Sequence, residues 1–278
     1  MEVKFKSALV AVPLLLMISC SGPEEKMDSK IETVEPNPSW DATNSIMYNE
    51  FLQCSSGQEY SQDALDEMIK AWRDLELPES MLGAWGYSSL NDDNEIIIDQ
   101  WEISWTSKES AEKSWEEWAN NEKATTWTEK YTSVLQCDSE NRLGYDFLFP
   151  HDPYAFGPTP ENGSFVATFS PCQLNEGMQE EDLSNEIIKY NNWLDTIDPA
   201  TINGFYAYGI YFPVGESGDE DFKYGNFFET LQTISDIDNA WEESPEKTSD
   251  LNQEISSCSN PELSNGQVFY DPQDPNFS

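Results

Sequence analysis

Basic residues are scarce in this 278-residue chain, which has 14 Lys and Arg against 53 Asp and Glu and a formal net charge of −39. A surface this acidic repels phosphate backbones, so we expect no nucleic-acid partner. The chain contains a single histidine, His151, which argues against histidine-based metal or triad chemistry. We therefore predict neither a metal site nor a cofactor.

Long apolar runs are also absent, except for one near the N-terminus. Residues 8–18 are apolar and follow the basic residues Lys4 and Lys6. A run of this length suits the apolar segment of a signal peptide and is too short to span a bilayer. We expect an exported chain that is attached to a membrane rather than embedded in one.

The end of this run carries an attachment signal. Residues 16–20, Leu-Met-Ile-Ser-Cys, resemble the lipobox of bacterial lipoproteins. The resemblance implies that residues 1–19 are removed as a signal peptide and that Cys20 is lipidated. With Ser21 next, it implies an outer-membrane lipoprotein on the periplasmic or the surface side. The alternative is an ordinary signal peptide with an unrelated cysteine. Residues 20–44 are polar and contain three prolines, so we predict a flexible tether.

Aromatic residues are plentiful, with 10 Trp, 12 Tyr and 14 Phe, which is enough to build a core. The first half of the folded part resembles the second half in the order of short matching segments, such as Trp115-Glu-Glu and Trp241-Glu-Glu. A repeat of about 120 residues indicates a duplicated domain. We divide the folded part into a first repeat, a linker and a second repeat, at residues 45–150, 151–163 and 164–278.

Both halves show the same order of predicted elements. In the first half a strand is followed by an amphipathic helix, in which Leu65, Met68, Ile69 and Trp72 recur at helical spacing. Two strands, a second helix and a last strand follow, which gives the β-α-β-β-α-β order of a ferredoxin-like unit. The predicted class is α+β. Two such units in one chain resemble a fused dimeric α/β barrel, as in the NIPSNAP-like and antibiotic-monooxygenase-like superfamily.

Four cysteines remain once Cys20 is set aside, and an even number in an exported chain suggests disulfides. Cys54, Cys137, Cys172 and Cys258 allow three pairings. The ferredoxin-like resemblance implies that the first and last strands of each unit lie side by side and antiparallel. It thereby implies the pairs Cys54–Cys137 and Cys172–Cys258.

Strand alternation yields candidates for the barrel lumen. Trp85 and Tyr87 share one face of their strand, and Tyr206 and Tyr208 share one face of theirs, with small residues opposite. We expect these four aromatic side chains to point into the lumen and to contact a ligand. The alternative is that they serve only as packing.

Two glutamates are candidates for catalysis. Glu102 and Glu229 occupy matching positions in the repeat alignment and are predicted to form a carboxylate pair inside the lumen or at its rim. A carboxylate in an aromatic cavity has a raised pKa and suits a general base. The alternative is that both are solvated at the rim.

Three functions compete on this evidence. The first is a membrane-anchored binding protein whose lumen holds a small apolar or aromatic molecule. The second is a cofactor-independent oxygenase or isomerase that uses a lumen carboxylate. The third is a structural or interaction protein with a filled lumen. The resemblance also includes haem enzymes, which imply an axial histidine, and only His151 is available.

Overall fold

The computed structural model describes residues 46–90, 96–215, 217–244 and 254–278. The chain divides into a unit of residues 1–35 and a unit of residues 36–278, and the second unit holds every described element. The predicted signal peptide, Cys20 and the predicted tether lie outside the described residues. Within the described part, no helix is long and apolar enough to cross a membrane.

The first half of the barrel has the predicted β-α-β-β-α-β order with one helix and one short strand added. Its elements are β1 (Met47–Ser56), α2 (Gln62–Arg73), β2 (Met81–Ser89), β3 (Gln100–Trp105), α3 (Lys108–Ala119), α4 (Glu122–Tyr131), β4 (Leu135–Cys137) and β5 (Leu143–Leu148). Helix α2 begins where the Ser61 side chain accepts a hydrogen bond from the backbone N–H of Ala64. Its periodic apolar residues form one buried face.

The second half repeats this plan. Its elements are β6 (Ser164–Leu174), α5 (Glu180–Leu194), a 3₁₀ turn η1 (Pro199–Thr201), β7 (Tyr206–Val214), β8 (Phe222–Phe228), α6 (Leu231–Glu242), β9 (Ser256–Cys258) and β10 (Glu262–Tyr270). In both halves the first and last long strands are antiparallel neighbours, because β5 pairs with β1 and β10 pairs with β6.

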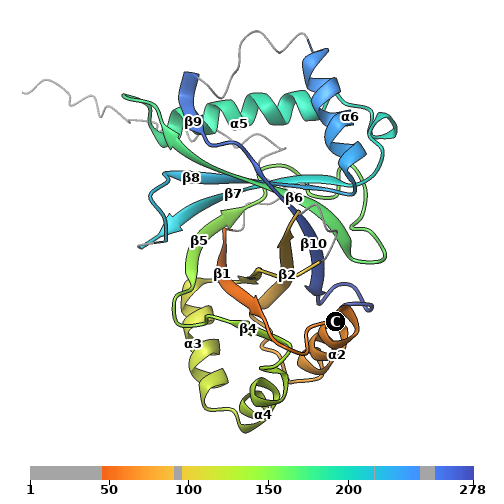
Figure 1. The fold of residues 1–278 in the computed structure, drawn as a ribbon. Helices are drawn as coiled ribbons and strands as arrows, with labels where there is room; N and C mark the ends of the chain where they lie inside the picture. Colours follow the sequence, from red (N-terminus) through yellow and green to blue (C-terminus); the bar gives the residue numbers. More distant parts are fainter. Residues whose placement is uncertain (1–45, 91–95, 216, 245–253) are drawn as a thin grey trace, which may run out of the picture. The chain divides into compact units, whose positions relative to one another are not determined.

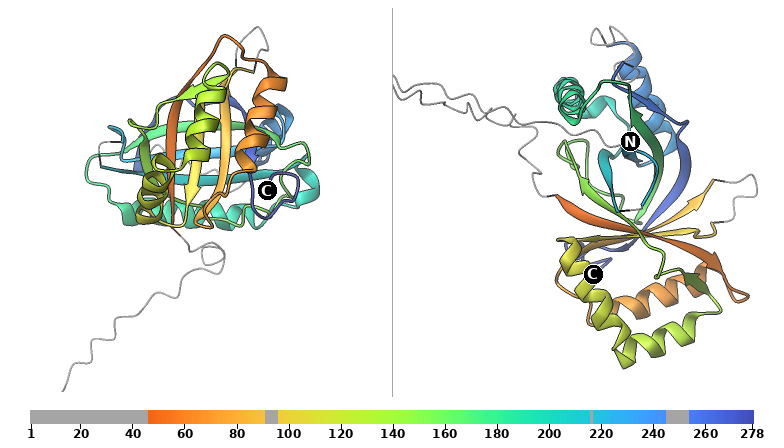
Figure 2. Two further views of the ribbon diagram at one scale, coloured as in Figure 1. Left: turned by 90° about the horizontal axis from the view of Figure 1, so that it is seen from below. Right: turned by 90° about the vertical axis from the view of Figure 1, so that its left-hand side faces the viewer.

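The last strand of each half also joins the other half, and this closes the barrel. β5 pairs with β7, and β10 pairs with β2, so the strands run β10-β2-β3-β1-β5-β7-β8-β6 and return to β10. The helices α2, α3 and α4 lie on one side of the strands and α5 and α6 on the other (Figure 1). Figure 2 shows the strands between these two groups of helices in its right-hand view. The predicted pseudo-dimeric α/β barrel is confirmed.

Three apolar clusters follow from this arrangement. One lies between the first half's helices and strands, around Trp72 and Trp101. A second lies under α5 and α6, around Ile187 and Tyr208. The third lines the lumen and is mostly aromatic. Its buried members are Phe51, Tyr87, Tyr145, Phe147, Phe165, Ala167, Phe169, Phe205, Ala207, Tyr211, Phe227 and Val268.

Both predicted disulfides are present. Cys54 on β1 is bonded to Cys137 on β4, and Cys172 on β6 is bonded to Cys258 on β9. In each case the two cysteines face each other across an antiparallel strand pair. Disulfides persist in oxidising compartments, so this pair of bonds indicates an extracytoplasmic protein.

Candidate functional site

The strand register decides which residues of the two halves are equivalent. Cys54 and Cys172 occupy the same place in their halves, and counting from them makes Phe51 equivalent to Phe169. Phe51 pairs with Glu102 across β1 and β3, whereas Phe169 pairs with Gly225 across β6 and β8. The counterpart of Glu102 is therefore a glycine, and Glu102 is the single carboxylate at these two positions.

The predicted carboxylate pair is therefore wrong. Glu229 follows the end of β8 and is exposed, and its Oε2 accepts a hydrogen bond from the backbone N–H of Phe205 at 3.0 Å. The repeat alignment matches Glu102 with Glu229, which lies four residues past the true counterpart, Gly225. Glu229 is therefore outside the strand. Its position is that of a strand-end carboxylate held by a backbone amide.

Glu102 lies in the lumen as the alternation of β3 predicts, with 1% of the residue exposed. Its Oε1 accepts hydrogen bonds from Asn49 Nδ2 at 2.6 Å and from the Tyr211 hydroxyl at 2.9 Å. Its Oε2 accepts one from the Tyr87 hydroxyl at 2.6 Å. Ser104 in turn donates to Asn49 Oδ1 at 2.7 Å and fixes the orientation of the amide. We call Glu102, Asn49, Tyr87 and Tyr211 the Glu102 cluster.

Burial and hydrogen bonding act in opposite directions on this carboxylate. Burial is the larger effect and raises the pKa of Glu102 above its ordinary value, although the donors Tyr87, Asn49 and Tyr211 and the charge of Lys223 lower it. Burial and the neighbouring Glu102 raise the pKa of both tyrosines well above the ordinary value. Tyr87 and Tyr211 therefore stay protonated at neutral pH and remain donors to Glu102.

Tyr87 and Tyr211 are themselves equivalent positions of the two halves. Tyr87 pairs with Gln100 on β3, and Tyr211 pairs with Lys223 at the matching position of β8. The resemblance of Gly83-Ala-Trp-Gly-Tyr87 to Gly204-Phe-Tyr-Ala-Tyr208 aligns Tyr87 with Tyr208 and misses Tyr211. An alignment in the correct register would have identified Tyr211, because the same tyrosine occurs at this position in both halves.

The lumen also contains a lysine that sequence reasoning missed. The Nζ of Lys223 lies 4.1 Å from the ring centroid of Phe51, 4.2 Å from that of Tyr145, 5.0 Å from that of Tyr211 and 5.4 Å from that of Phe169. Contacts of this length are cation–π interactions. Burial lowers the pKa of Lys223 to about 8. It has no ion-pair partner among the described residues.

All four residues of the Glu102 cluster line a cavity of about 110 Å³. Trp85 and Tyr87 both line it, as predicted from strand alternation. Its other lining residues come from the lumen strands, from the joint between the two halves and from the end of β10; they are Asn49, Glu102, Phe147, Phe149, Pro153, Tyr154, Thr159, Phe165, Phe205, Ala207, Tyr211, Phe227, Val268 and Asp271.

The prediction that Tyr206 and Tyr208 face the lumen is wrong. Tyr208 donates to Asn191 Oδ1 on α5, and the Tyr206 hydroxyl lies 2.8 Å from that of Tyr190 on the same helix. The small residues of β7 face the lumen instead. A Cβ added to Gly209 would lie 2.2 Å from Cε2 of Phe147, so the neighbouring ring occupies the space that the missing side chain leaves.

The lone histidine does not fit the role of an axial haem ligand in the lumen. His151 Nε2 lies 3.0 Å from Asp195 Oδ1, and its ring stacks on Phe156 at an interplanar angle of 28°. Phe156 belongs to the apolar cluster under α5 and α6. In the described part of the chain, no group of three or more His, Cys, Asp or Glu residues is placed to hold a metal ion.

Comparison with known proteins found matches only among solved structures. No family model and no curated protein matches the chain. A double mutant of chlorite dismutase from Candidatus Nitrospira defluvii is 9% identical with a TM-score of 0.47, covering 82% of this chain and 94% of that chain. The same enzyme in complex with imidazole is 10% identical with a TM-score of 0.46, at the same coverage. An anthrone oxidase-like protein is 13% identical with a TM-score of 0.46, covering 81% and 92%.

Proposed function

We propose that this chain is an exported, membrane-anchored binding protein whose barrel lumen holds a small aromatic or apolar molecule with one hydrogen-bond donor. The observation that carries the proposal is the Glu102 cluster, a fixed carboxylate beside an aromatic-walled cavity. Ligand pockets commonly combine apolar walls with a few fixed polar groups that orient the ligand.

The carboxylate of Glu102 retains capacity for a ligand. An ionised carboxylate offers about four lone-pair sites. Three are occupied, two on Oε1 by Asn49 and Tyr211 and one on Oε2 by Tyr87. The remaining site belongs to Oε2, and a hydroxyl or N–H donor of the ligand would satisfy it.

The size of the cavity limits the ligand to a single ring. Its volume is about 110 Å³. An engineered apolar cavity of about 150 Å³ binds benzene in another protein. Aromatic residues fill the rest of the lumen, so larger ligands would require the rings to move.

The hydrogen bonds of Glu102 favour a role as a fixed acceptor. Asn49, Tyr87 and Tyr211 hold both carboxylate oxygens in place, so that Glu102 orients a ligand. Burial outweighs these donors and leaves the pKa of Glu102 above its ordinary value, which makes general-base catalysis the second candidate function.

Calorimetric titration with phenol and with toluene tests this proposal. The two molecules have nearly the same shape, and only phenol carries a donor. We expect phenol to bind about tenfold more tightly, because a hydrogen bond to a charged group contributes about 1.5–3 kcal/mol. Glu102→Gln should reduce the preference, because the amide oxygen is a neutral acceptor, whereas Glu109→Gln, a charge removal at an exposed position on α3, should not change it. No binding of either molecule would refute the proposal and favour a filled, structural lumen.

The anchor is tested separately. The proposal places a lipid on Cys20, supported by the lipobox-like residues and by the disulfides of an exported chain. Cells expressing the full chain and fed radiolabelled palmitate should label the wild type and leave Cys20→Ser unlabelled. Equal labelling of the two would contradict the anchor and leave the lumen proposal standing.

A further inference from the structure

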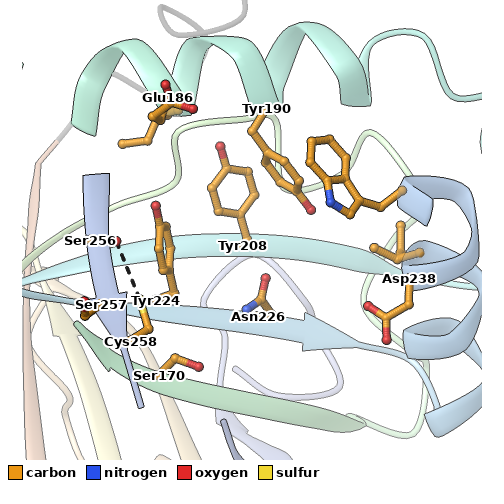
Figure 3. Close-up of a pocket in the computed structure, with 13 residues that line it drawn as sticks. Ser170, Glu186, Tyr190, Tyr208, Tyr224, Asn226, Asp238, Ser256, Ser257 and Cys258 are labelled. Atoms are coloured by element: carbon orange, nitrogen blue, oxygen red, sulfur yellow. Dashed lines mark hydrogen bonds between the residues drawn. The ribbon is translucent and has the colours of Figure 1, made fainter. Parts of the chain in front are cut away.

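A second cavity lies outside the barrel lumen, between α5, α6 and the strands of the second half (Figure 3). Its volume is about 720 Å³, several times that of the lumen cavity. Its lining residues are Ser170, Glu186, Ile187, Tyr190, Tyr208, Tyr224, Asn226, Ile237, Asp238, Trp241, Ser256, Ser257 and Cys258. The lumen proposal makes no use of this cavity.

One carboxylate of this cavity has an unsatisfied acceptor. The Glu186 side chain is 8% exposed, and its Oε1 accepts from Lys189 Nζ at 2.5 Å. Its Oε2 is buried without a hydrogen-bond partner among the described residues. Lys189 does not line the cavity, and its side chain is 57% exposed. A buried acceptor without a donor is destabilising, so this position calls for a donor from a ligand.

A second carboxylate and a row of aromatic rings complete the cavity. Asp238 on α6 is exposed at the cavity's rim. Figure 3 shows Tyr190 and Tyr208 lying between Glu186 at one end and Asp238 at the other. Trp241 packs against Tyr190 with ring centroids 5.8 Å apart. No Lys, Arg or His lines the cavity within the described part of the chain.

We propose that this cavity binds a linear diamine or oligoamine, with one ammonium group at Glu186, another at Asp238 and the methylene chain along the tyrosine rings. Ammonium groups donate charge-assisted hydrogen bonds to carboxylates. Aromatic faces attract the same cations and cover their apolar stems. A cavity with acceptors at both ends and no basic residue suits a ligand with a positive charge at each end.

Titration with three molecules of equal length tests the proposal. Hexamethylenediamine has two ammonium groups, hexylamine has one and hexamethylene glycol has none. At an ionic strength of about 0.15 M, which screens long-range attraction, we expect calorimetry to rank them in that order. The ammonium group at the buried Glu186 should contribute about tenfold in affinity, and the one at the exposed Asp238 should contribute less.

Matched variants separate this cavity from general attraction of cations to a chain with a net charge of −39. Glu186→Gln should weaken diamine binding about tenfold. Glu181→Gln removes the same charge from an exposed position on the same helix and should change binding less than twofold. Circular dichroism checks that both variants fold. If Glu186→Gln does not fold, Asp238→Asn provides a second test.

Two results would overturn the proposal: equal affinity for the three molecules, or equal weakening by Glu186→Gln and Glu181→Gln. The lumen proposal is independent of both. Glu102→Gln should leave diamine binding unchanged, and Glu186→Gln should leave the preference for phenol over toluene unchanged.

Discussion

Replacement of Lys223 by methionine should make the protein more stable at neutral pH. Burial lowers the pKa of the Lys223 ammonium to about 8 from an ordinary value of 10.5, although the charges of Glu102, Glu220 and Glu262 oppose this. Each pH unit corresponds to about 1.4 kcal/mol, so the buried charge costs about 3 kcal/mol of stability. Methionine has a similar length and no charge, and it packs well against aromatic rings.

The expected gain is smaller than this full amount. The cation–π contacts with the four rings favour the protonated amine, and such contacts contribute about 0.5–2 kcal/mol. We therefore expect Lys223→Met to raise the free energy of unfolding by about 1–3 kcal/mol at pH near 7. Urea titration followed by tryptophan fluorescence measures this difference.

The pH dependence gives the sharper test. Between about pH 8 and 10.5 the unfolded chain keeps the lysine proton and the folded chain loses it, so the stability of the wild type rises with pH. The advantage of Lys223→Met should shrink through this range and be clearly reduced by about pH 9.5, before unfolded tyrosines ionise near pH 10. Lys113→Met, at a side chain that is 76% exposed, should show no such trend. A constant difference between wild type and Lys223→Met across this range would refute the argument.

Two further predictions concern the barrel itself. Replacing Cys54 and Cys137 together by serine opens a loop with a sequence separation of 83 residues. The chain-entropy model predicts a loss of about 4.5 kcal/mol in the free energy of unfolding, measurable by urea titration against the wild type under oxidising conditions. Gly209→Ala should destabilise by about 1–3 kcal/mol, because the added Cβ would lie 2.2 Å from Cε2 of Phe147. An unchanged unfolding midpoint in the double serine variant would contradict the predicted loss from the disulfide. An unchanged midpoint in Gly209→Ala would contradict the close contact with Phe147.

Local patterns were sufficient to predict the order of elements and the fold. The helical spacing of Leu65, Met68 and Trp72 marks α2 because only one face of that helix is buried. The alternation of β3 correctly assigns Glu102 to the lumen, since Trp101 and Ile103 pack toward the helices. The disulfide pairs follow from the resemblance because a ferredoxin-like sheet brings the cysteine-bearing segments together.

The apolar pattern of β7 does not show which of its faces points into the lumen, because both faces are apolar. Tyr206 and Tyr208 lie on one face, and Ala207 and Tyr211 lie on the other. Where helices cover one face of a strand and an aromatic lumen covers the other, apolar residues do not indicate which face points inward. The repeat alignment placed this strand three residues out of register, and an odd shift moves every side chain to the opposite face.

The correct register also shows that duplication did not leave two equivalent lumen sites. Glu102 has Gly225 as its counterpart, and Lys223 has Gln100. The carboxylate is therefore supplied by the first half and the ammonium by the second, and neither charge is repeated. Within the Glu102 cluster, Tyr87 and Tyr211 are the equivalent pair, and both donate to the same carboxylate. The proposed binding site at Glu102 is consequently single, and we expect one phenol to bind per chain because the two halves are asymmetric.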